Sequence, residues 1–504
     1  MTILKPIFEQ DPERPAALAG SETITYGRLC ADIDSMAHWL FAQGLEPGDR
    51  ITIHSRDVGN SSYWDWIMHL GALRAGLTQS TGGMPPQVAR TGAIGPYKAA
   101  LGDMTQLSPQ ANPERKLEFG ARGPEPLAEQ LEFERTNRKL DDLESQAVRL
   151  LSTSGTTGRP KVISWDSAML EARLKQVRET CDLGPEVKLW SILGMITTTG
   201  LRYPLAQWQL GGLVILGSIG SEQTDLATAA ATSTFVATSP FRMGHILRLI
   251  PGEWPGKETR VIELFGGRVP PGMRDEALAR CCSTLRMSYG ATEVGRVAAG
   301  ETSLVDRHSG AVGFVEPGIT VEIVDRQGNA RPTGETGIVR MKSDFMCEGY
   351  VGQPAQAGPR ASLRDGWFYP GDFGILFEDG LFAIAGRLSE TLNLSGAKLS
   401  PLEIEERVAK LPEVEDVCAV ALQMDNADVL AIAVTCADDV DLKVLRQEVA
   451  KLAPPQFPMT ILKVPRIPRN AMGRIPRQAF ANALTEQAKQ AVKARHERAV
   501  AEKA

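Results

Sequence analysis

The chain is 504 residues long, 43% hydrophobic and 23% charged, with a formal net charge of −6. This length exceeds the size at which a single hydrophobic core stops growing, so we expect two or more domains. The mild negative charge argues against nucleic acid as a partner, because binding to a phosphate backbone requires clustered positive charge. No run of about 18 apolar residues predicts a membrane span, and the N-terminus lacks the basic and apolar regions of a secretory signal.

The cysteines and histidines indicate neither disulfides nor a structural zinc site. The seven cysteines are scattered without a Cys-x-x-Cys pair, and the adjacent Cys281 and Cys282 are typical of buried apolar residues. A chain without a disulfide pattern fits a reducing cytoplasm. The six histidines lack the spacing of zinc ligands.

The first part of the chain alternates strands and helices. Apolar residues at helical spacing predict a helix over residues 26–43, which Gly44 ends, and a second helix over residues 63–75. The same part predicts strands at residues 22–25 and 51–53. Residues 108–144 are charged and weakly patterned, and we interpret them as a surface loop with a short helix. The alternation predicts layers of helix on a mainly parallel sheet.

The α/β pattern continues beyond residue 145 and then changes. A helix is predicted near residues 167–180. Strands are predicted at residues 148–151, 162–165, 189–193, 212–216 and 234–238. From Gly313 to Gly380, alternating segments are separated by turns that carry glycine and aspartate, which predicts antiparallel sheet or a small β-barrel.

A domain boundary is expected near residues 386–390, and we place it between residues 387 and 388. Beyond it, helices are predicted at residues 401–410 and 442–452, with strands at residues 417–422 and 429–435. Residues 478–504 are helix-prone and are interpreted as a solvated, partly frayed tail, with an interaction helix as the alternative. The expected fold is a large N-terminal domain (1–387) of layered α/β subdomains plus a small antiparallel β-barrel, followed by a small mobile α+β C-terminal domain (388–504).

Residues 152–161 read Ser-Thr-Ser-Gly-Thr-Thr-Gly-Arg-Pro-Lys and lie between two predicted strands. Glycines let the backbone approach a ligand closely, and successive N–H groups and hydroxyls can surround an anion. Lys161 adds a point charge. The spacing is not that of a Walker A motif. The chemistry indicates a phosphate loop, although a flexible hairpin loop fits the same residues.

Further stretches follow this loop in a fixed order. They are residues 263–269, with two glycines after a strand, residues 288–293 (Ser-Tyr-Gly-Ala-Thr-Glu), residues 366–372, which end on an aspartate after a turn, and residues 386–398 at the domain boundary. With residues 24–26, 47–49 and 468–474, their order and intervals resemble the adenylate-forming superfamily of acyl-CoA synthetases, peptide-synthetase adenylation domains and luciferases. The resemblance covers nearly the whole chain and is closest to acyl-CoA synthetases.

The resemblance implies an ATP site. Thr292 matches the contact to the α-phosphate, Glu293 matches the Mg²⁺ ligand, and Asp372 matches the acceptor for the ribose hydroxyls. Tyr289 would stack on the adenine, and Arg387 would contact the nucleotide at the hinge. The full set of nucleotide-binding residues that it implies is Thr153, Ser154, Gly155, Thr156, Thr157, Gly158, Lys161, Gly267, Arg268, Val269, Ser288, Tyr289, Gly290, Ala291, Thr292, Asp372, Arg387 and Lys398.

The implied catalytic residues are Lys161, Thr292, Glu293 and Arg474, and the last departs from the family pattern. The family has a lysine there that bridges the substrate carboxylate and the α-phosphate. Arg474 keeps the charge, but its guanidinium is a planar fork. Because a misplacement of about 1 Å can cost roughly a hundredfold, adenylation is expected to be slow unless the pocket is shaped for a guanidinium.

The implied hinge and thiol-binding residues lie close together in the sequence. Ser389 stands at the hinge, where the family usually has aspartate or lysine, and it remains compatible with domain rotation. Gly396 matches a glycine that lines the pantetheine tunnel of coenzyme A, and Lys398 matches a basic residue of some acyl-CoA synthetases. The local likeness is closest to acetyl- and propionyl-type enzymes.

The acyl pocket is expected at residues 194–200 and around Phe265. Its expected residues are Met195, Thr197, Thr198, Thr199, Gly200 and Phe265. Residues 194–200 contain no acidic side chain for a substrate ammonium and no histidine of the kind that aryl-acid enzymes carry. The threonines indicate an apolar pocket with hydroxyl contacts, and packing at a strand end is the alternative.

The resemblance therefore implies a two-step ligase. A carboxylic acid attacks the α-phosphate of ATP·Mg²⁺ to give an acyl-adenylate and pyrophosphate, the C-terminal domain turns, and the thiol of coenzyme A takes the acyl group. One alternative passes the acyl group to an amine or to a carrier-protein phosphopantetheine. Another, motivated by Arg474 and Ser389, is a nucleotide-binding protein with little catalysis. The sequence names neither the acid nor the oligomeric state.

Overall fold

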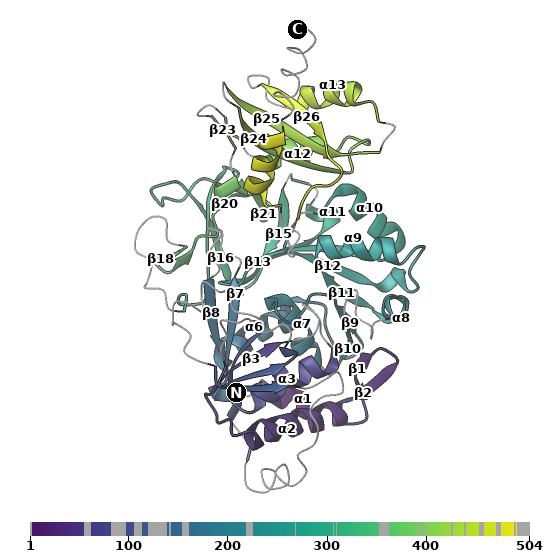
Figure 1. Cartoon of the computed structure of the whole chain (residues 1–504), viewed down its shortest axis with the longest axis vertical. Helices are drawn as coiled ribbons and strands as arrows, with labels where there is room; N and C mark the ends of the chain where they lie inside the picture. Colours follow the sequence, from purple (N-terminus) through teal and green to yellow (C-terminus); the bar gives the residue numbers. More distant parts are fainter. Residues whose placement is uncertain are drawn as a thin grey trace, which may run out of the picture.

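The structure is a computed structural model. It describes residues 3–54, 62–81, 97–104, 113–118, 139–140, 143–153, 161–217, 225–267, 269–305, 307–308, 310–351, 362–390, 392–394, 397–399, 401–424, 427–437, 440–452, 458–469, 475–487 and 490. A large body holds most of the helices and strands, and a smaller unit drawn in yellow holds α13 and β24 to β26 (Figure 1). The mixed α/β architecture predicted from the sequence is confirmed.

The largest sheet has a parallel half. Its strands are, in spatial order, β1 (Pro15–Ala19), β10 (Leu213–Leu216), β9 (Lys188–Ser191), β11 (Phe235–Thr238), β12 (Val261–Phe265) and β13 (Thr284–Ala291). Each neighbouring pair is parallel, and β2 (Glu22–Thr25) is antiparallel to β1 at the edge. The helices between these strands are α7 (Thr198–Gln209), α8 (Leu226–Thr232), α9 (Pro240–Leu249) and α10 (Pro271–Arg280). Parallel strands end at one edge of a sheet, so the segments after β9, β12 and β13 open onto the same side.

The predicted antiparallel region is present, and it continues the same sheet. Strand β13 pairs antiparallel with β14 (Gly295–Glu301), which begins the antiparallel half. The further strands are β15 (Ala311–Val315), β16 (Ile319–Val324), β17 (Gly337–Ser343), β18 (Leu363–Arg364), β19 (Trp367–Phe368), β20 (Asp372–Leu376) and β21 (Leu381–Arg387). Their apolar sides enclose one core cluster that includes Val321, Met341 and Phe382.

A second sheet carries the hairpin of the predicted phosphate loop. Its order is β6 (Arg115–Glu118), β5 (Ala99–Gly102), β3 (Arg50–His54), β4 (Thr78–Thr81), β7 (Val148–Thr153) and β8 (Lys161–Asp166). Strands β7 and β8 are antiparallel, with Thr153 opposite Lys161, whereas the other pairs are parallel. Strand β6 corrects the prediction of a loop at residues 115–118, and the 3-10 turn η2 (Leu143–Gln146) overlaps only the end of the segment 108–144. Most of that segment, where a short helix was predicted, lies outside the described residues.

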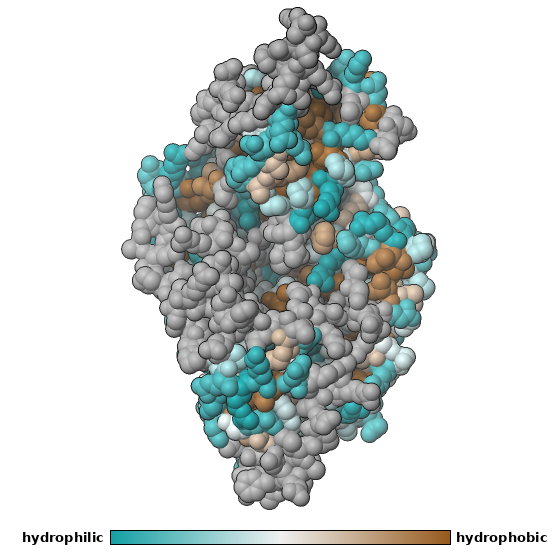
Figure 2. Space-filling view, viewed as in Figure 1, coloured by the Kyte–Doolittle hydropathy of each residue, from teal (hydrophilic) through white to brown (hydrophobic). Residues whose placement is uncertain are grey.

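Helices cover the sheets and share one large core. They are α1 (Lys5–Phe8), α2 (Tyr26–Ala42), α3 (Tyr63–Arg74), α6 (Ser167–Thr180) and α11 (Thr302–Val305), with a 3-10 turn η3 (Lys257–Thr259). Gly44 and Gly76 follow α2 and α3 with φ of 73° and 70°, a left-handed conformation that glycine adopts without strain. None of the helices in the described ranges is long and apolar enough to cross a bilayer. On the face shown in Figure 2, hydrophobic residues appear in separate groups among hydrophilic ones.

The C-terminal unit has its own core and sheet. Its elements are η4 (Leu388–Glu390), β22 (Leu392–Leu394), β23 (Ala397–Leu399), α12 (Pro401–Val408), β24 (Asp416–Met424), β25 (Ala427–Thr435), α13 (Leu442–Leu452) and β26 (Met459–Lys463). Strand β26 pairs parallel with β25 and was not predicted. Residues 477–487 form a helix that buries Phe480 and Leu484 against β24, so the interpretation of a solvated tail is wrong for this part. The domain division at residues 387 and 388 stays a prediction.

Candidate active site

The turn between β13 and β14 holds Thr292 and Glu293, two of the predicted catalytic residues. Arg173 of α6 donates to the backbone carbonyls of both, each at 2.9 Å. The Arg173 guanidinium lies over the Trp165 ring, 4.3 Å from its centroid, and donates to the Phe345 carbonyl at 3.0 Å. Arg173 is the residue that fixes this turn, and it lies in no motif that the sequence singled out.

Tyr350 connects Glu293 to Lys161. Its hydroxyl donates to Glu293 Oε1 at 2.9 Å, and the Lys161 Nζ atom lies 4.3 Å from the centroid of its ring. Lys161 Nζ also donates to Ser362 Oγ at 3.1 Å. The backbone N–H of Val351 donates to the carbonyl of Val162, which brings Tyr350 beside the strand that starts at Lys161. Tyr350 is therefore a second site residue that the motifs missed.

Burial shifts the titration of both charged groups toward neutrality. Glu293 is 8% exposed, and burial raises the pKa of its carboxyl, while the Tyr350 hydroxyl and Lys161 act in the opposite direction. Burial lowers the pKa of the Lys161 ammonium, and the charge of Glu293 partly offsets that effect. Charges held in a desolvated place interact more strongly with a phosphate or a cation than charges in water do.

A second group of predicted nucleotide residues meets at the carboxyl end of the sheet. The Tyr289 hydroxyl donates to Asp372 Oδ2 at 2.6 Å, and Arg387 Nε lies 3.2 Å from Asp372 Oδ1. Strand pairing places Asp372 directly opposite Arg387 on β20 and β21. Asp372 is only 1% exposed. The three residues come from separate motifs, and the fold joins them into one polar cluster.

The Ser288 hydroxyl belongs to a buried ionic network below this cluster. It donates to Glu263 Oε1 at 2.7 Å and accepts from Arg296 Nε at 2.8 Å. Arg296 also forms ion pairs with Glu263 at 2.7 Å and with Glu316 at 2.8 Å. The Tyr203 hydroxyl donates to Glu263 Oε2 at 3.1 Å. The network connects the predicted adenine segment on β13 with α7.

The predicted acyl segment forms the turn that starts α7. Thr197 is the N-cap residue: its hydroxyl accepts from the Gly200 N–H and donates to the Gly194 carbonyl, both at 2.9 Å. A side chain at Gly200 would overlap the carbonyl oxygens of Leu193 and Gly194, so glycine is required there. Met195 is fully buried, whereas Thr198 and Thr199 are partly exposed. The ring of Phe265 on β12 meets that of Tyr203 edge-on at 5.2 Å.

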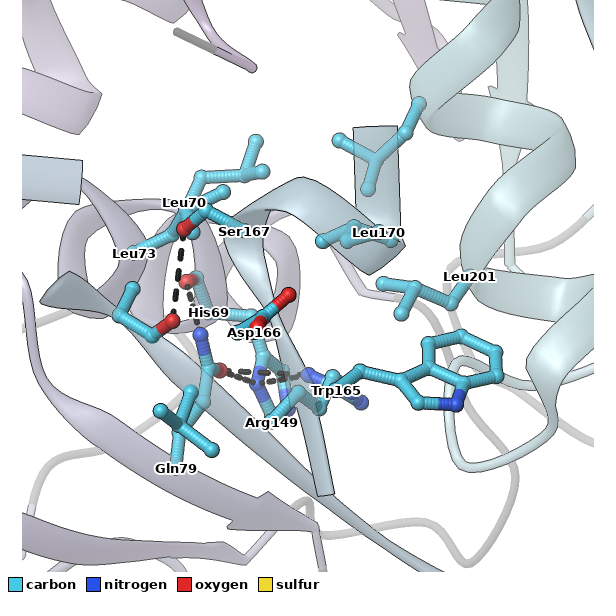
Figure 3. A pocket seen from close by; sticks show the side chains of 13 residues that line it. His69, Leu70, Leu73, Gln79, Arg149, Trp165, Asp166, Ser167, Leu170 and Leu201 are labelled. Atoms are coloured by element: carbon cyan, nitrogen blue, oxygen red, sulfur yellow. Dashed lines mark hydrogen bonds between the residues drawn. The ribbon is translucent and has the colours of Figure 1, made fainter. Parts of the chain in front are cut away.

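A small cavity lies behind this turn, between α3, α6, α7 and β7 (Figure 3). His69 Nδ1 lies 2.6 Å from Gln79 Oε1 and 3.0 Å from Arg149 Nη1. Arg149 Nη2 donates to the Met195 carbonyl at 2.8 Å, and burial lowers the pKa of His69 well below its usual range. At about 20 Å³ the cavity holds about one water molecule and is too small for a substrate. We assign it a supporting role.

Some of the predicted residues lie outside the described part of the chain. These are Ser154, Gly155, Thr156, Thr157, Gly158, Arg268, Gly396 and Arg474. The side chains of Thr153, Ser389 and Lys398 also lie outside the description, although their backbones are placed in β7, η4 and β23. Gly267, Val269, Gly290 and Ala291 lie in the described segments around the ends of β12 and β13.

Within the described ranges, no group of three His, Cys, Asp or Glu side chains is arranged to hold a metal ion. Mg²⁺ needs no such cage, because it is commonly bound by one or two carboxylates, waters and substrate phosphates. The Glu293 carboxylate, with Tyr350 bonded to only Oε1 and Lys161 nearby for the phosphates, fits that mode of binding.

The model of the AMP-binding enzyme family matches residues 103–351. The chain is 25% identical to the fatty acid–[acyl-carrier-protein] ligase ScoC of Streptomyces coeruleorubidus, over 93% of each chain. It is also 25% identical to the 3-hydroxybenzoate–CoA/4-hydroxybenzoate–CoA ligase of Thauera aromatica, over 94% of each. ATP-bound MatB from Rhodopseudomonas palustris has the same fold, with a TM-score of 0.80 at 21% identity over 96% of this chain and 99% of MatB. The AMP-binding match at residues 103–351 and the likeness of nearly the whole chain to these ligases agree with the adenylate-forming superfamily that the motifs resemble.

Proposed function

We propose that this chain activates a carboxylic acid with ATP and Mg²⁺ to an acyl-adenylate and then transfers the acyl group to the thiol of coenzyme A. The observation that carries this proposal is the position of Tyr350 between two charges. Its hydroxyl holds the Glu293 carboxylate, and its ring lies against the Lys161 ammonium. A carboxylate and a cation held on one ring can receive Mg²⁺ and the phosphates of one ATP molecule.

Each of the candidate site residues would have its own role in adenylation. Lys161 neutralises phosphate charge, and Glu293 holds Mg²⁺, which would spread the charge that develops on the phosphates. Asp372 accepts hydrogen bonds from the ribose hydroxyls, in exchange for part of its present bonding to Tyr289 and Arg387. Arg173 keeps the Thr292–Glu293 turn in place while the nucleotide binds. Arg474 contributes the cation that joins the two substrates.

The second step needs the C-terminal unit to move. We place the hinge at Ser389, in the 3-10 turn η4 that directly follows β21. Arg477 bonds to Glu405 on α12 and lies 3.6 Å from Glu390 in η4, so α12 and the hinge turn move as one body. Gly396 and Lys398 would then contact the pantetheine arm. On this scheme residues 1–387 and 388–504 are separate domains, and a reducing cytoplasm is the proposed location.

The thiol that accepts the acyl group could also belong to an acyl carrier protein. Curated relatives at 25% identity include ligases for acyl carrier proteins, such as FadD10 of Mycobacterium tuberculosis, as well as coenzyme A ligases. Both acceptors present the same phosphopantetheine thiol, so the described residues support either. We place coenzyme A first because of the resemblance at Gly396.

The experiment is a pyrophosphate-release assay with a panel of carboxylic acids, in which coenzyme A, a phosphopantetheinylated carrier protein or an amine is added in separate reactions. We expect pyrophosphate release with at least one acid and a thioester with coenzyme A. A thioester with the carrier protein alone would select the second candidate, and an amide alone would refute thiol transfer. If the wild type releases no pyrophosphate and the Arg474→Lys variant does, the protein would instead be a nucleotide-binding protein with little catalysis.

A further inference from the structure

The N-terminus of α7 has the features of an anion-binding site. The helix has 12 residues, and of the N–H groups in its first turn the cap Thr197 accepts a hydrogen bond from that of Gly200. Among the described residues, no acceptor is bonded to the N–H groups of Thr198 and Thr199. The preceding Ile196 is 40% exposed, so this turn can be reached from solvent. Free N–H groups at a helix N-terminus, together with the helix dipole, attract negative charge.

Arg202 supplies a second and independent observation. It is only 3% exposed, and its Nε atom donates back along the helix to the Thr198 carbonyl at 3.2 Å. The buried Nη1 atom has no hydrogen-bond partner, and no acidic residue in the described ranges forms an ion pair with Arg202. The guanidinium therefore lies at the first turn of α7, and its Nη1 donors have no acceptor among the described residues.

The surroundings of Arg202 do not neutralise it. Glu263 acts on it electrostatically, but the Glu263 carboxylate is already bonded to Arg296, Ser288 and Tyr203. Arg173 lies on the neighbouring helix α6, where the positive charge of Arg202 adds to burial in lowering the pKa of Arg173, and Arg296 acts on Arg202 in the same direction. A buried guanidinium without an anionic partner is costly, so a partner that arrives with the ligand would remove this cost.

We infer that Arg202 and the N-terminus of α7 bind a second carboxylate on the acid, so that the substrate is a dicarboxylic acid. The inference rests on the proposed function, because it takes residues 194–200 as the wall of the acyl pocket. The ATP phosphates are drawn to Lys161 and to Mg²⁺ on Glu293, and the reacting carboxylate must lie at the α-phosphate beside Thr292. The N–H groups at the start of α7 and the Arg202 guanidinium then remain to bind the other end of the acid. An alkyl chain in that place would leave the Arg202 guanidinium without a partner.

Matched pairs of acids test this directly in the pyrophosphate-release assay. The pairs are succinate with butyrate, glutarate with valerate, and adipate with hexanoate. Because a hydrogen bond to a charged group is worth about 1.5–3 kcal/mol, we expect a kcat/KM about tenfold or more higher for the dicarboxylate in at least one pair. A higher kcat/KM for the monocarboxylate in every pair would overturn the inference.

Variants show whether Arg202 carries this preference. Arg202→Met is expected to reduce the dicarboxylate preference about tenfold, through KM and without loss on monocarboxylates, and Arg202→Lys is expected to keep part of it. Arg178→Met is the matched control, because Arg178 pairs with Glu171 near the other end of α7 and should leave the preference unchanged. An equal loss on both acids would show instead that Arg202 serves the reacting carboxylate, and the inference would be wrong.

A further measurement separates this inference from the proposed function. Thermal unfolding of the wild-type protein is followed with succinate, glutarate or adipate and with the matched monocarboxylates, without ATP. We expect at least one dicarboxylate, added without ATP, to raise the unfolding temperature of the wild-type protein. Because this measurement needs only the wild type, it tests the inference even if Arg202→Met does not fold. Stabilisation without pyrophosphate release for any acid would refute the ligase but keep the α7 site. Release with monocarboxylates, and no effect of any dicarboxylate, would refute the site but keep the ligase.

Discussion

Two buried arginines on packed helices differ in what holds them. Arg173 of α6 donates to three backbone carbonyls and lies against the Trp165 ring. Arg202 of α7 has one hydrogen bond, to a carbonyl of its own helix. Both are at least 97% buried. Burial lowers the pKa of Arg173 to about 9, and it lowers that of Arg202 as well.

The difference separates a structural charge from a charge that serves a ligand. The hydrogen bonds of Arg173 are made within the chain, and they hold the turn that carries Thr292 and Glu293. Arg202 makes one hydrogen bond, and its Nη1 atom has no partner in the described part of the chain. It lies beside the N-terminus of α7, where the N–H groups of Thr198 and Thr199 also have no acceptor among the described residues. On our proposals, the nucleotide side of the candidate site is built by the protein itself, whereas the acyl side is completed by the substrate. The predictions below test this contrast.

The largest effect is expected for Arg173→Met. The change removes the guanidinium from three carbonyls, and among the described residues only that of Glu293 keeps another donor, the N–H of Cys347. Each buried group left unsatisfied costs about 1–3 kcal/mol. We expect the free energy of unfolding to fall by about 3 kcal/mol or more, measured by urea denaturation followed by tryptophan fluorescence. ATP binding should weaken with it, because the Thr292–Glu293 turn loses its support. A loss below about 1 kcal/mol would remove the distinction between the two arginines.

Gly200→Ala should be next in size. A Cβ atom there would overlap the carbonyl oxygens of Leu193 and Gly194, and overpacking of this kind costs about 1–3 kcal/mol. The matched control is Gly267→Ala, whose Cβ would find its nearest neighbour, Pro240, at 3.6 Å. We expect the control to unfold like the wild type and to lose affinity for ATP only, as measured by calorimetry. Equal stability of both variants would contradict the account of the turn before α7.

The helices that the sequence predicted were placed well because their signal is local, but α7, α8, α9 and α10 were not predicted. Apolar spacing placed α2, α6 and α13 within a residue of their observed bounds. Strand β6 was missed because Arg115–Glu118 is a mostly exposed, charged edge strand whose pattern does not alternate clearly. Strand β26 was missed because it follows a proline-rich segment and is defined by its parallel pairing with β25.

The motifs predicted residues of the candidate site but not their partners. Lys161, Glu293 and Asp372 lie in stretches that resemble a family, so each could be named from a short segment. Tyr350 is 57 residues from Glu293, and Arg173 is 119 residues from Thr292. Contacts of this range leave no local pattern in one sequence. The same is true of the missing partner of Arg202, because burial and an unmade hydrogen bond exist only in the folded chain.

Tyr350→Phe should have a smaller effect on the nucleotide side. The variant keeps the ring against Lys161 and removes only the hydroxyl that orients Glu293, which is worth about 1–1.5 kcal/mol. We expect the Mg²⁺ concentration for half-maximal ATP binding to rise about tenfold, with metal-free ATP binding unchanged. Tyr350→Leu, which also loses the ring, should weaken both. An unchanged Mg²⁺ requirement in the Phe variant would show that Glu293 is held by other groups.

The smallest effect is expected for Arg202→Met on stability without substrate. Methionine fills much of the same volume, breaks one hydrogen bond and removes a buried charge that has no ion-pair partner in the described part of the chain. Since replacing an uncompensated buried charge by an apolar group is often neutral or stabilising, we expect the free energy of unfolding to change by less than about 1 kcal/mol. Succinate, glutarate or adipate should then stabilise the wild type but not the variant. If Arg202→Met instead lost as much stability as Arg173→Met, both arginines would be structural, and the acyl side of the site would be complete without its substrate.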